Sequence, residues 1–494
     1  MIVLLIALTA GVAEVERPDF WAGNEELRGY LLEAAENNPG LLARYEQWRA
    51  KLERIPQVTS LDDPMLSYGQ FVQSETQRAQ LMVSQKFPWF GTLRARGDKA
   101  AAEADAALQA FLSERNRLFA EVKRAYFDYA FLAEGIRVSE AQLEVLKYME
   151  DIVTSKLALA MAHQDELLRV SIEQSRVEDR RDGLLQRRPA LMARLNESLG
   201  RNVLEERPWP QSSVFPPALP EPEAVMARIE QANPDLRAFD HLIESRERDI
   251  ELARKKGYPD FTLGLEYMNM KSPGQMRPDR PYPASLNAGY RTLNTLTGRM
   301  PFDPVNAAID TYSLVTSNEP MTYADSMDDD IMISLSVSVP IWRRRVRAGI
   351  EEASLLRRAT EHEKRRQELA LQSAARAAVF EVEDAQRRYA LYRDTLVPQA
   401  EQTYESLQSQ YAAAEVGAGF LDLLDSVQTL LAFELEQVRA ARDWQTGAAQ
   451  LEFLMGGPWA QSDDTAALGG TDSPSTETQL PITVTRSGGE NERR

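Results

Sequence analysis

The sequence predicts a mainly α-helical protein with a small β part, built from a helix–β-hairpin–helix unit that occurs twice. Three observations predict this fold class. A segment at about 93–159 carries a heptad repeat of apolar residues, which is typical of a coiled coil. Four short segments have the length and character of strands, and the clearest alternates apolar and polar residues. Asn-Pro, Gly and Leu-Leu signals of the first half recur in the second half in the same order, at offsets of 195 to 256 residues.

The amino-acid composition argues against several classes of function. The chain has 494 residues, a formal net charge of −18 and a pI of about 4.9, which argues against nucleic acid as a partner. Cysteine is absent, and the only histidines, at 163, 241 and 362, are too far apart in sequence for a local metal motif. Because no catalytic constellation is evident either, we expect no enzyme activity, no cofactor and no metal site.

The N-terminal residues 1–13 resemble a truncated secretory signal peptide. Ile2–Val12 is mostly apolar, and small residues lead up to a cleavage site after Ala13. The positive segment that normally precedes such a stretch is missing, so the alternative is an apolar tag on a cytosolic protein. Elsewhere no run reaches the roughly 18 continuous apolar residues of a membrane helix.

The first repeat is predicted at 14–207, with strands at about 64–72 and 80–88. The second strand ends at a Pro-Trp-Phe-Gly sequence, and a helix follows from about Leu93 to about Leu159. At 1.5 Å per residue this helix is about 100 Å long, too long for a compact globular domain. Eleven of fourteen heptad positions in it are apolar, namely 111, 118, 125, 132, 146 and 153 in one series and 122, 129, 136, 143 and 157 in the other.

The second repeat is predicted at 223–457, after a Pro-rich linker at 208–222. Asn233-Pro234 follows Asn38-Pro39 at an offset of 195 residues, and Leu423-Leu424 follow Leu167-Leu168 at 256. The offset grows between the two strands of this repeat, at about 260–270 and 330–340, so a loop is inserted at 271–328. The polar tail at 458–494 has no apolar period and is expected to be disordered.

The strand at about 330–340 is the clearest of the four. Its apolar residues alternate with serines, and Pro340 then removes a backbone donor and ends the ladder. Trp342 follows, and four arginines lie within the next five residues. The alternating apolar residues are Ile331, Ile333, Leu335, Val337 and Val339.

Four strands of this length suit a membrane but cannot close a barrel, since the smallest membrane barrels have about eight. Because an open sheet edge is not tolerated in lipid, we expect several chains to close the sheet, three of them giving twelve strands. Trp89, Phe90 and Trp342 lie where strand becomes helix, as an aromatic girdle at a membrane interface would. The alternative is a soluble four-stranded sheet on a helical bundle, which the long helices disfavour.

From about Asn24 to Gly457 the chain resembles the TolC-like outer-membrane efflux proteins. The resemblance rests on the duplicated layout, on KKGYPDFTLGLEY at 255–267, on SVSVPIW at the strand-to-proline junction, and on EVGAGFLDLLDS at 415–426. It implies a homotrimer with a twelve-stranded β-barrel in outer-membrane lipid, continued by a coiled-coil tunnel across the periplasm. The segment QKFPWFGTLRAR at 85–96 is similar to the branch serving heavy-metal pumps of the resistance-nodulation-division type.

The resemblance also implies a function and partners. A member of this family is the passive outer-membrane duct of a tripartite system, with a periplasmic adaptor and an inner-membrane pump. The alternative from another class is a coiled-coil envelope adaptor without a pore, which would not need four two-faced strands with aromatic flanks. The inserted loop at 271–328 departs from the short loop usual in the family and is expected to face the cell exterior.

Two sets of residues are the candidate site. The hairpin tips near Met161–Asp165 and Glu415–Phe420 are expected to dock the adaptor; the residues are Ala162, His163, Gln164, Gly417, Ala418 and Gly419. Asp422 and Asp425, three apart on one helix face, match positions where the family places lumen-facing aspartates, which would form a periplasmic gate. The alternative is that they only complement the helix dipole.

Overall fold

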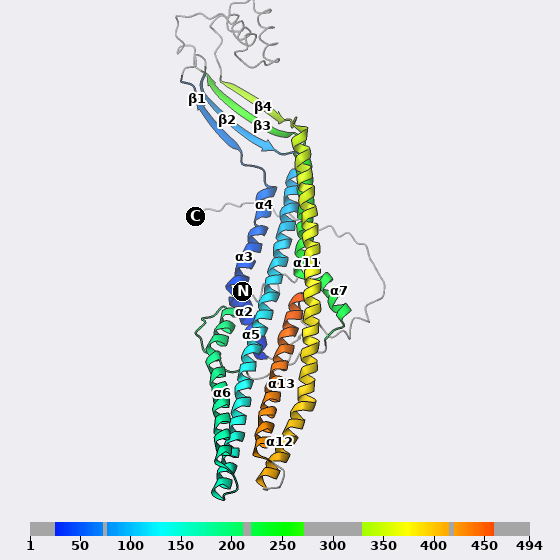
Figure 1. Ribbon diagram of the computed structural model, residues 1–494. Coiled ribbons are helices and arrows are strands. Elements are labelled where there is room, and N and C mark those ends of the chain that lie inside the picture. The colour runs from blue at the N-terminus through cyan, green and yellow to red at the C-terminus, as the bar shows by residue number, and fades with distance from the viewer. Residues whose placement is uncertain (1–24, 73–76, 211–218, 271–328, 414–418, 459–494) are drawn as a thin grey trace, which may run out of the picture.

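A computed structural model describes residues 25–72, 77–210, 219–270, 329–413 and 419–458. Long helices run side by side, and one four-stranded sheet stands at one end of them (Figure 1). This architecture confirms the predicted mainly α fold with a small β part. The expected signal segment 1–13, the inserted loop 271–328 and nearly all of the tail lie outside the described residues.

The first half has five helices and two strands in the described residues. Three helices precede the β-hairpin and two long ones follow it, α5 packing against α6. The elements are α2 (Glu25–Asn37), α3 (Pro39–Leu52), α4 (Arg54–Thr59), β1 (Met65–Gln70), β2 (Gln77–Phe87), α5 (Thr92–Ala158) and α6 (Gln164–Ser198).

The second half has the same order of helices, two strands and helices. The π-helical turn η2 joins α11 to α12 without a break, at the point where Pro398 has no N–H to donate back along the helix. The elements are α7 (Pro222–Ala232), α8 (Pro234–Lys255), β3 (Asp260–Met270), β4 (Asp330–Ser338), α11 (Arg343–Leu391), η2 (Tyr392–Leu396), α12 (Val397–Ala412) and α13 (Phe420–Leu454).

The two Asn-Pro sequences have the same structural role. The Asn38 side chain accepts hydrogen bonds from backbone N–H groups in the first turn of α3 and donates one to the Ser198 carbonyl over 3.0 Å. Asn233 caps α8 in the same way and donates to the Leu454 carbonyl over 2.8 Å. Asparagine is a favoured N-cap and proline suits the first helical position, which explains why the pair recurs.

A glycine at the end of a helix packs against each of the two Asn-Pro turns, Gly200 in the first half and Gly456 in the second. Gly200 and Gly456 have φ angles of 70° and 82°, where a side chain is strained. A Cβ at Gly200 would lie 2.4 Å from the Asn37 carbonyl oxygen, and one at Gly456 would lie 2.5 Å from that of Ala232. Each helix end therefore needs a glycine to approach the Asn-Pro turn.

The heptad seam of α5 faces the interior. α5 has 67 residues and packs against α6, α8 and α13. Burial of apolar side chains there contributes about 1.5–3 kcal/mol for a leucine. This packing, more than helix propensity, stabilises α5. The buried members of the predicted series include Leu118, Ala125, Leu132, Leu146 and Val153, with Val122, Tyr129, Ile136 and Leu143 from the second series.

The sheet is antiparallel with the order β1-β2-β3-β4. Its register places apolar side chains opposite one another on one face, and these side chains are exposed. On the other face the pairs are Ser84–Gly264–Ser334 and Lys86–Thr262–Ser336. Within the described residues β1 and β4 each leave one edge without a partner strand. Two apolar rows are Leu66–Val83–Leu265–Ile333 and Tyr68–Leu81–Tyr267–Ile331.

Among the described residues, no helix combines the length and the apolar character needed to cross a membrane.

Candidate functional site

Two of the three aromatic residues predicted at the strand-to-helix junction, Trp89 and Phe90, lie together with two that the sequence did not single out. The Trp89 ring stacks on Tyr258 with centroids 5.0 Å apart and on Phe261 at 5.9 Å. Phe90 and Trp342 point their rings into solvent, with 77% and 71% of their surface exposed. The junction therefore presents aromatic rings beside the apolar face of the sheet.

The tip of the first helical hairpin is a short turn between α5 and α6. Ala160 has a φ of 57°, an uncommon conformation for a non-glycine residue. His163 is the N-cap residue of α6, although its side chain makes no cap hydrogen bond. His163 and Gln164 are exposed and Ala162 is half-buried. In the second tip, Gly417 and Ala418 lie outside the described residues, and Gly419 directly precedes α13.

A cluster of polar contacts ties the two tips together. The Tyr411 hydroxyl on α12 donates a hydrogen bond to Glu166 on α6 over 2.7 Å. Lys156, at the end of α5, donates to the Tyr411 carbonyl, and its ammonium lies 3.7 Å from the centroid of the Tyr411 ring. Burial and the hydrogen bond to Glu166 raise the pKa of Tyr411, so the phenol stays protonated and remains a donor.

An apolar core lies just behind these contacts and is shared by both hairpins. Gln428 on α13 donates to Glu173 on α6 over 2.8 Å, and Gln142 on α5 donates to the Val427 carbonyl over 3.1 Å. Within one chain the two tips are therefore one packed unit. The buried residues of this core include Leu146, Met149 and Val153 of α5, Val170 of α6, and Phe420, Leu423 and Val427 of α13.

Asp422 and Asp425 lie in the first two turns of α13 and are exposed. One Asp422 carboxylate oxygen accepts a hydrogen bond from the Gly419 N–H over 3.3 Å. In the part of the chain that is described, no ion pair or hydrogen bond involves the Asp425 side chain. The contact from Gly419 ties Asp422 to the start of α13, and the choice between a gate and a helix-dipole role stays a prediction for both aspartates.

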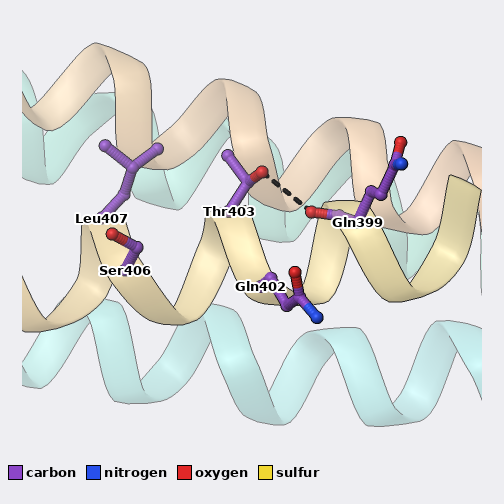
Figure 2. Close-up of a pocket in the computed structure, with 5 residues that line it drawn as sticks. All are labelled: Gln399, Gln402, Thr403, Ser406 and Leu407. Carbon is purple, nitrogen blue, oxygen red and sulfur yellow. Dashed lines mark hydrogen bonds between the residues drawn. The ribbon is translucent and has the colours of Figure 1, made fainter.

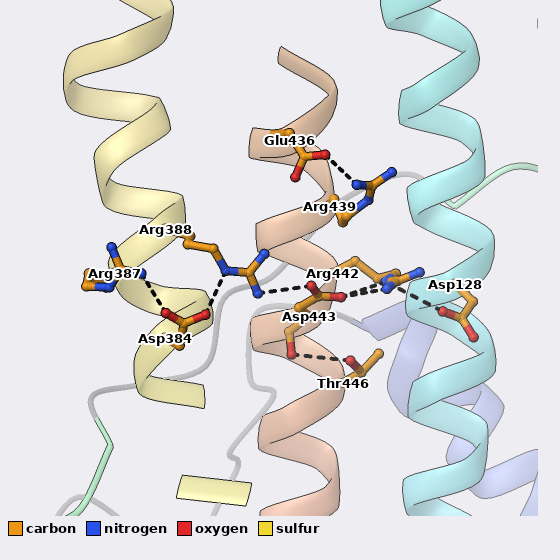
Figure 3. A network of polar contacts seen from close by, with 9 residues as sticks. All are labelled: Asp128, Asp384, Arg387, Arg388, Glu436, Arg439, Arg442, Asp443 and Thr446. Atoms are coloured by element: carbon orange, nitrogen blue, oxygen red, sulfur yellow. Dashed lines mark hydrogen bonds and ion pairs between the residues drawn. The ribbon is translucent and has the colours of Figure 1, made fainter. Parts of the chain in front are cut away.

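A ladder of ion pairs crosses the middle of the helices (Figure 3). Arg388 on α11 bridges Asp384 and Asp443, at 2.9 and 3.2 Å, and Asp443 on α13 also pairs with Arg442 at 2.6 Å. Arg442 reaches Asp128 on α5 at 3.9 Å. Burial raises the pKa of Asp128, against the pull of Arg442 and Arg194. The ladder joins α5, α11 and α13, so we interpret it as a structural contact between these helices.

A surface depression lies along α12 (Figure 2). It is lined by Gln399, Gln402, Thr403, Ser406 and Leu407, and Thr403 donates a hydrogen bond to the Gln399 carbonyl over 2.8 Å. None of these side chains titrates near neutral pH. The depression therefore has no acid, base or nucleophilic pair of the kind that catalysis needs.

Comparison with known proteins agrees with this geometry. Residues 225–457 match the model of the outer membrane efflux protein family. The search of curated proteins returned no match.

Three solved structures share the fold at low sequence identity. The outer-membrane channel OprN has 15% identity and a TM-score of 0.65, over 90% of this chain and 93% of OprN. VceC from Vibrio cholerae has 16% identity and a TM-score of 0.63, over 87% of this chain and 96% of VceC. CusC has 14% identity and a TM-score of 0.66, over 90% of this chain and 96% of CusC.

The fold is that of an outer-membrane channel. The second half of the chain matches the outer membrane efflux protein family, and this match together with the shared fold confirms the predicted resemblance to the TolC-like channels and the predicted location in the outer membrane, extending into the periplasm. The family consists of transport channels and not of enzymes. The sequence identities to the three channels are nearly equal, so they do not favour one branch of the family. The heavy-metal branch suggested by residues 85–96 therefore stays a prediction.

Proposed function

We propose that three copies of this chain form a passive outer-membrane duct that completes a tripartite efflux system. A periplasmic adaptor joins the duct to an inner-membrane pump, which supplies the energy. The cargo is small molecules or metal ions, and the pump selects it. The duct itself needs no cofactor.

The observation that carries this proposal is the sheet. Its exposed apolar rows suit contact with lipid, and its opposite face, with Ser84, Ser334 and Ser336, suits a water-filled lumen. The open edges of β1 and β4 need partner strands in lipid. Three copies supply twelve strands, each β4 pairing with the β1 of a neighbour. The exposed rings of Phe90 and Trp342 fit the interface with water.

The helices support the same assembly. α5 is about 100 Å long at 1.5 Å per residue, so it reaches far below the bilayer. Large apolar side chains on α11 are exposed in the single chain and suit packing against the helices of a neighbouring subunit. These side chains are Leu355, Leu369 and Phe380.

For the hairpin tips we propose docking to the adaptor. The tips lie farthest from the sheet (Figure 1), and they expose apolar side chains that an interface would bury, among them Met161, Leu168 and Leu421. A charged substitution at Gly417 should abolish export while the trimer stays intact. Gly417 is a cleaner test than Gly419, where a Cβ would lie 2.9 Å from the Asp422 carboxylate. Normal export by the Gly417 variant would refute docking at this tip.

For Asp422 and Asp425 we propose the periplasmic gate. In a trimer they form two stacked rings of three carboxylates, which attract cations and bind multivalent ions that block the pore. Replacing both by Asn should lower cation selectivity and remove block by trivalent ions, with trimer stability changed by no more than about 1 kcal/mol per chain. Unchanged selectivity and block would assign both residues to helix capping alone.

The experiment that tests the duct is trimer analysis followed by conductance. The purified protein should migrate as a heat-resistant trimer in detergent and should conduct ions across planar bilayers. A soluble protein without conductance would favour the non-pore envelope adaptor. A folded monomer or a dimer in detergent would refute the shared barrel.

A further inference from the structure

We propose that a basic surface where the helices meet the sheet binds the phosphate groups of anionic phospholipids in the periplasmic leaflet of the membrane. This inference rests on the proposed membrane insertion of the sheet. We call the surface the basic collar; it consists of six exposed cationic side chains, Arg94, Arg254, Lys256, Arg344, Arg345 and Arg347.

Contacts between three helix ends bring the collar together. The start of α5, the end of α8 and the start of α11 meet below the sheet (Figure 1). The Lys255 ammonium donates to the Phe90 carbonyl over 3.2 Å, and Arg343 donates to the Gly257 carbonyl over 3.4 Å. The stack of Trp89 on Tyr258 holds the same two ends of α5 and α8 side by side.

The collar lacks counter-charges within the described residues. No ion pair or hydrogen bond there involves the side chains of the six collar residues. Several nearby carboxylates have other partners: Glu251 pairs with Arg248 and Lys255, and Asp260 pairs with Lys86. Glu351, one turn beyond Arg347, pairs with Arg358. A local cluster of unpaired cations therefore lies on a chain whose net charge is −18.

The position of the collar selects a lipid headgroup as the occupant. The exposed apolar residues Val337, Val339 and Ile341 lead directly to the exposed ring of Trp342. Arg344 and Arg347 follow Trp342 by two and five residues, roughly 3 and 8 Å along the helix axis. If the apolar side chains sit in hydrocarbon and the Trp342 ring at its boundary, the guanidinium groups sit at the depth of lipid phosphates.

The chemistry of the side chains favours anionic lipids. Five of the six collar residues are arginines, whose planar guanidinium donates two parallel hydrogen bonds to a phosphate. A zwitterionic headgroup carries its own cation beside its phosphate, so it offers no net charge to the collar. An anionic headgroup does, and we expect it to accumulate around the protein.

The test compares two matched variants of the full chain. Arg344→Gln/Arg347→Gln removes two collar arginines. Arg366→Gln/Arg376→Gln removes two exposed arginines of the same helix, far from the sheet, that also have no ion pair among the described residues. Each protein is reconstituted in phosphatidylcholine vesicles, and the association of spin-labelled phosphatidylglycerol is measured relative to that of spin-labelled phosphatidylcholine by electron paramagnetic resonance.

We expect wild type to prefer phosphatidylglycerol several-fold, with a preference that high salt reduces, and the Arg344/Arg347 variant to lose most of it. The Arg366/Arg376 variant should match wild type. Equal ratios for wild type and the collar variant, or an equal drop in both variants, would overturn the collar as a lipid site. A protein that immobilises neither spin label is not inserted, which would overturn the proposed membrane sheet and the collar with it.

Discussion

The two ends of the molecule differ in how much of their apolar surface and how many of their polar groups find partners within a single chain. At the hairpin tips, apolar side chains of α5, α6 and α13 are buried against one another, and polar side chains such as Tyr411 and Glu166 pair across the two hairpins. At the sheet end, whole apolar rows are exposed and two strand edges have no partner among the described residues. The hairpin ends therefore have a packed core within one chain, whereas under the proposed assembly the sheet completes its contacts with lipid and neighbouring chains.

This difference decides what a mutation reports. In the helical part, a substitution acts on contacts that one chain already makes, so it changes folding stability directly. On the exposed face of the sheet, under the proposed assembly, a substitution acts on contacts with lipid or another subunit. The following predictions test whether that division holds.

The largest effect is expected at the buried ion pair between Lys123 on α5 and Glu452 on α13. Burial lowers the pKa of Lys123, and the charge is tolerated because Glu452 lies beside it. Lys123→Met should reduce the free energy of unfolding by about 3–5 kcal/mol, because it removes the ammonium that faces the buried Glu452 carboxylate. Lys123→Met/Glu452→Leu should recover most of that loss. A double variant no more stable than the single one would show that packing and not charge dominates; chemical denaturation measures both.

The next effect concerns the sheet. Ile333 is 75% exposed and belongs to an apolar row, whereas Ser336 lies on the opposite face of β4. If the row faces hydrocarbon, Ile333→Lys should destabilise the inserted state by about 2–4 kcal/mol, while Ser336→Lys should have little effect. Stability in lipid vesicles is measured by urea titration. Equal effects of the two lysines would mean that neither face contacts lipid, and the contrast between the ends would fail.

The sequence predicted most of the helical part because its signals are local. Leu118, Leu132 and Leu146 recur at the heptad spacing, and that spacing alone is enough to place them on one buried face. The Asn-Pro pairs also have a local meaning, since asparagine caps and proline starts a helix. The alternation from Ile331 to Val337 predicted a two-faced strand, and β4 spans that alternation.

The candidate site was predicted less completely, for a physical reason. Trp89 and Trp342 were expected at the junction, but the stacking partners of Trp89, Tyr258 and Phe261, were not. The bond from Tyr411 to Glu166 joins residues 245 positions apart, and no local period encodes such a pair. The gate at Asp422 and Asp425, the docking tips and the trimer depend on contacts beyond one chain, so they stay predictions.

A smaller effect is expected where the two tips are tied. Tyr411→Phe keeps the ring beside Lys156 but removes the hydroxyl that donates to Glu166. Because the acceptor is a carboxylate, the loss should be about 1.5–3 kcal/mol, seen as faster hydrogen exchange near the ends of α5 and α6. Tyr404→Phe is the control, since the hydrogen bond of its hydroxyl among the described residues comes from Gln408 on the same helix. Equal changes in exchange for both variants would contradict a specific tie between the tips.

The smallest expected effect on stability depends on pH and concerns Glu434, which lies on α13 between the hairpin tips and the sheet. Burial, and then repulsion by Glu401, raise the pKa of Glu434 on α13 above its ordinary value. The folded state therefore holds this proton more tightly than the unfolded chain, and the corresponding stability is present below the unfolded pKa and lost as pH rises through the folded pKa. Glu434→Gln should therefore increase the free energy of unfolding at pH 7, seen as a higher Tm, by less than about 1 kcal/mol because solvent screens a partly exposed group. At pH 4 the variant and wild type should melt together.

Glu436→Gln is the matched control for Glu434→Gln, because Glu436 lies on the same helix but pairs with Arg439. It should bring no gain in Tm at pH 7. A gain for Glu434→Gln of the same size at pH 4 and pH 7 would contradict a titration effect, because an uncharged side chain brings no pH-dependent advantage unless the native carboxyl ionises between those values. The gain in Tm would then come from better packing of the uncharged side chain. It would mean that α13 around Glu434 is packed within one chain as fully as the buried heptad face of α5.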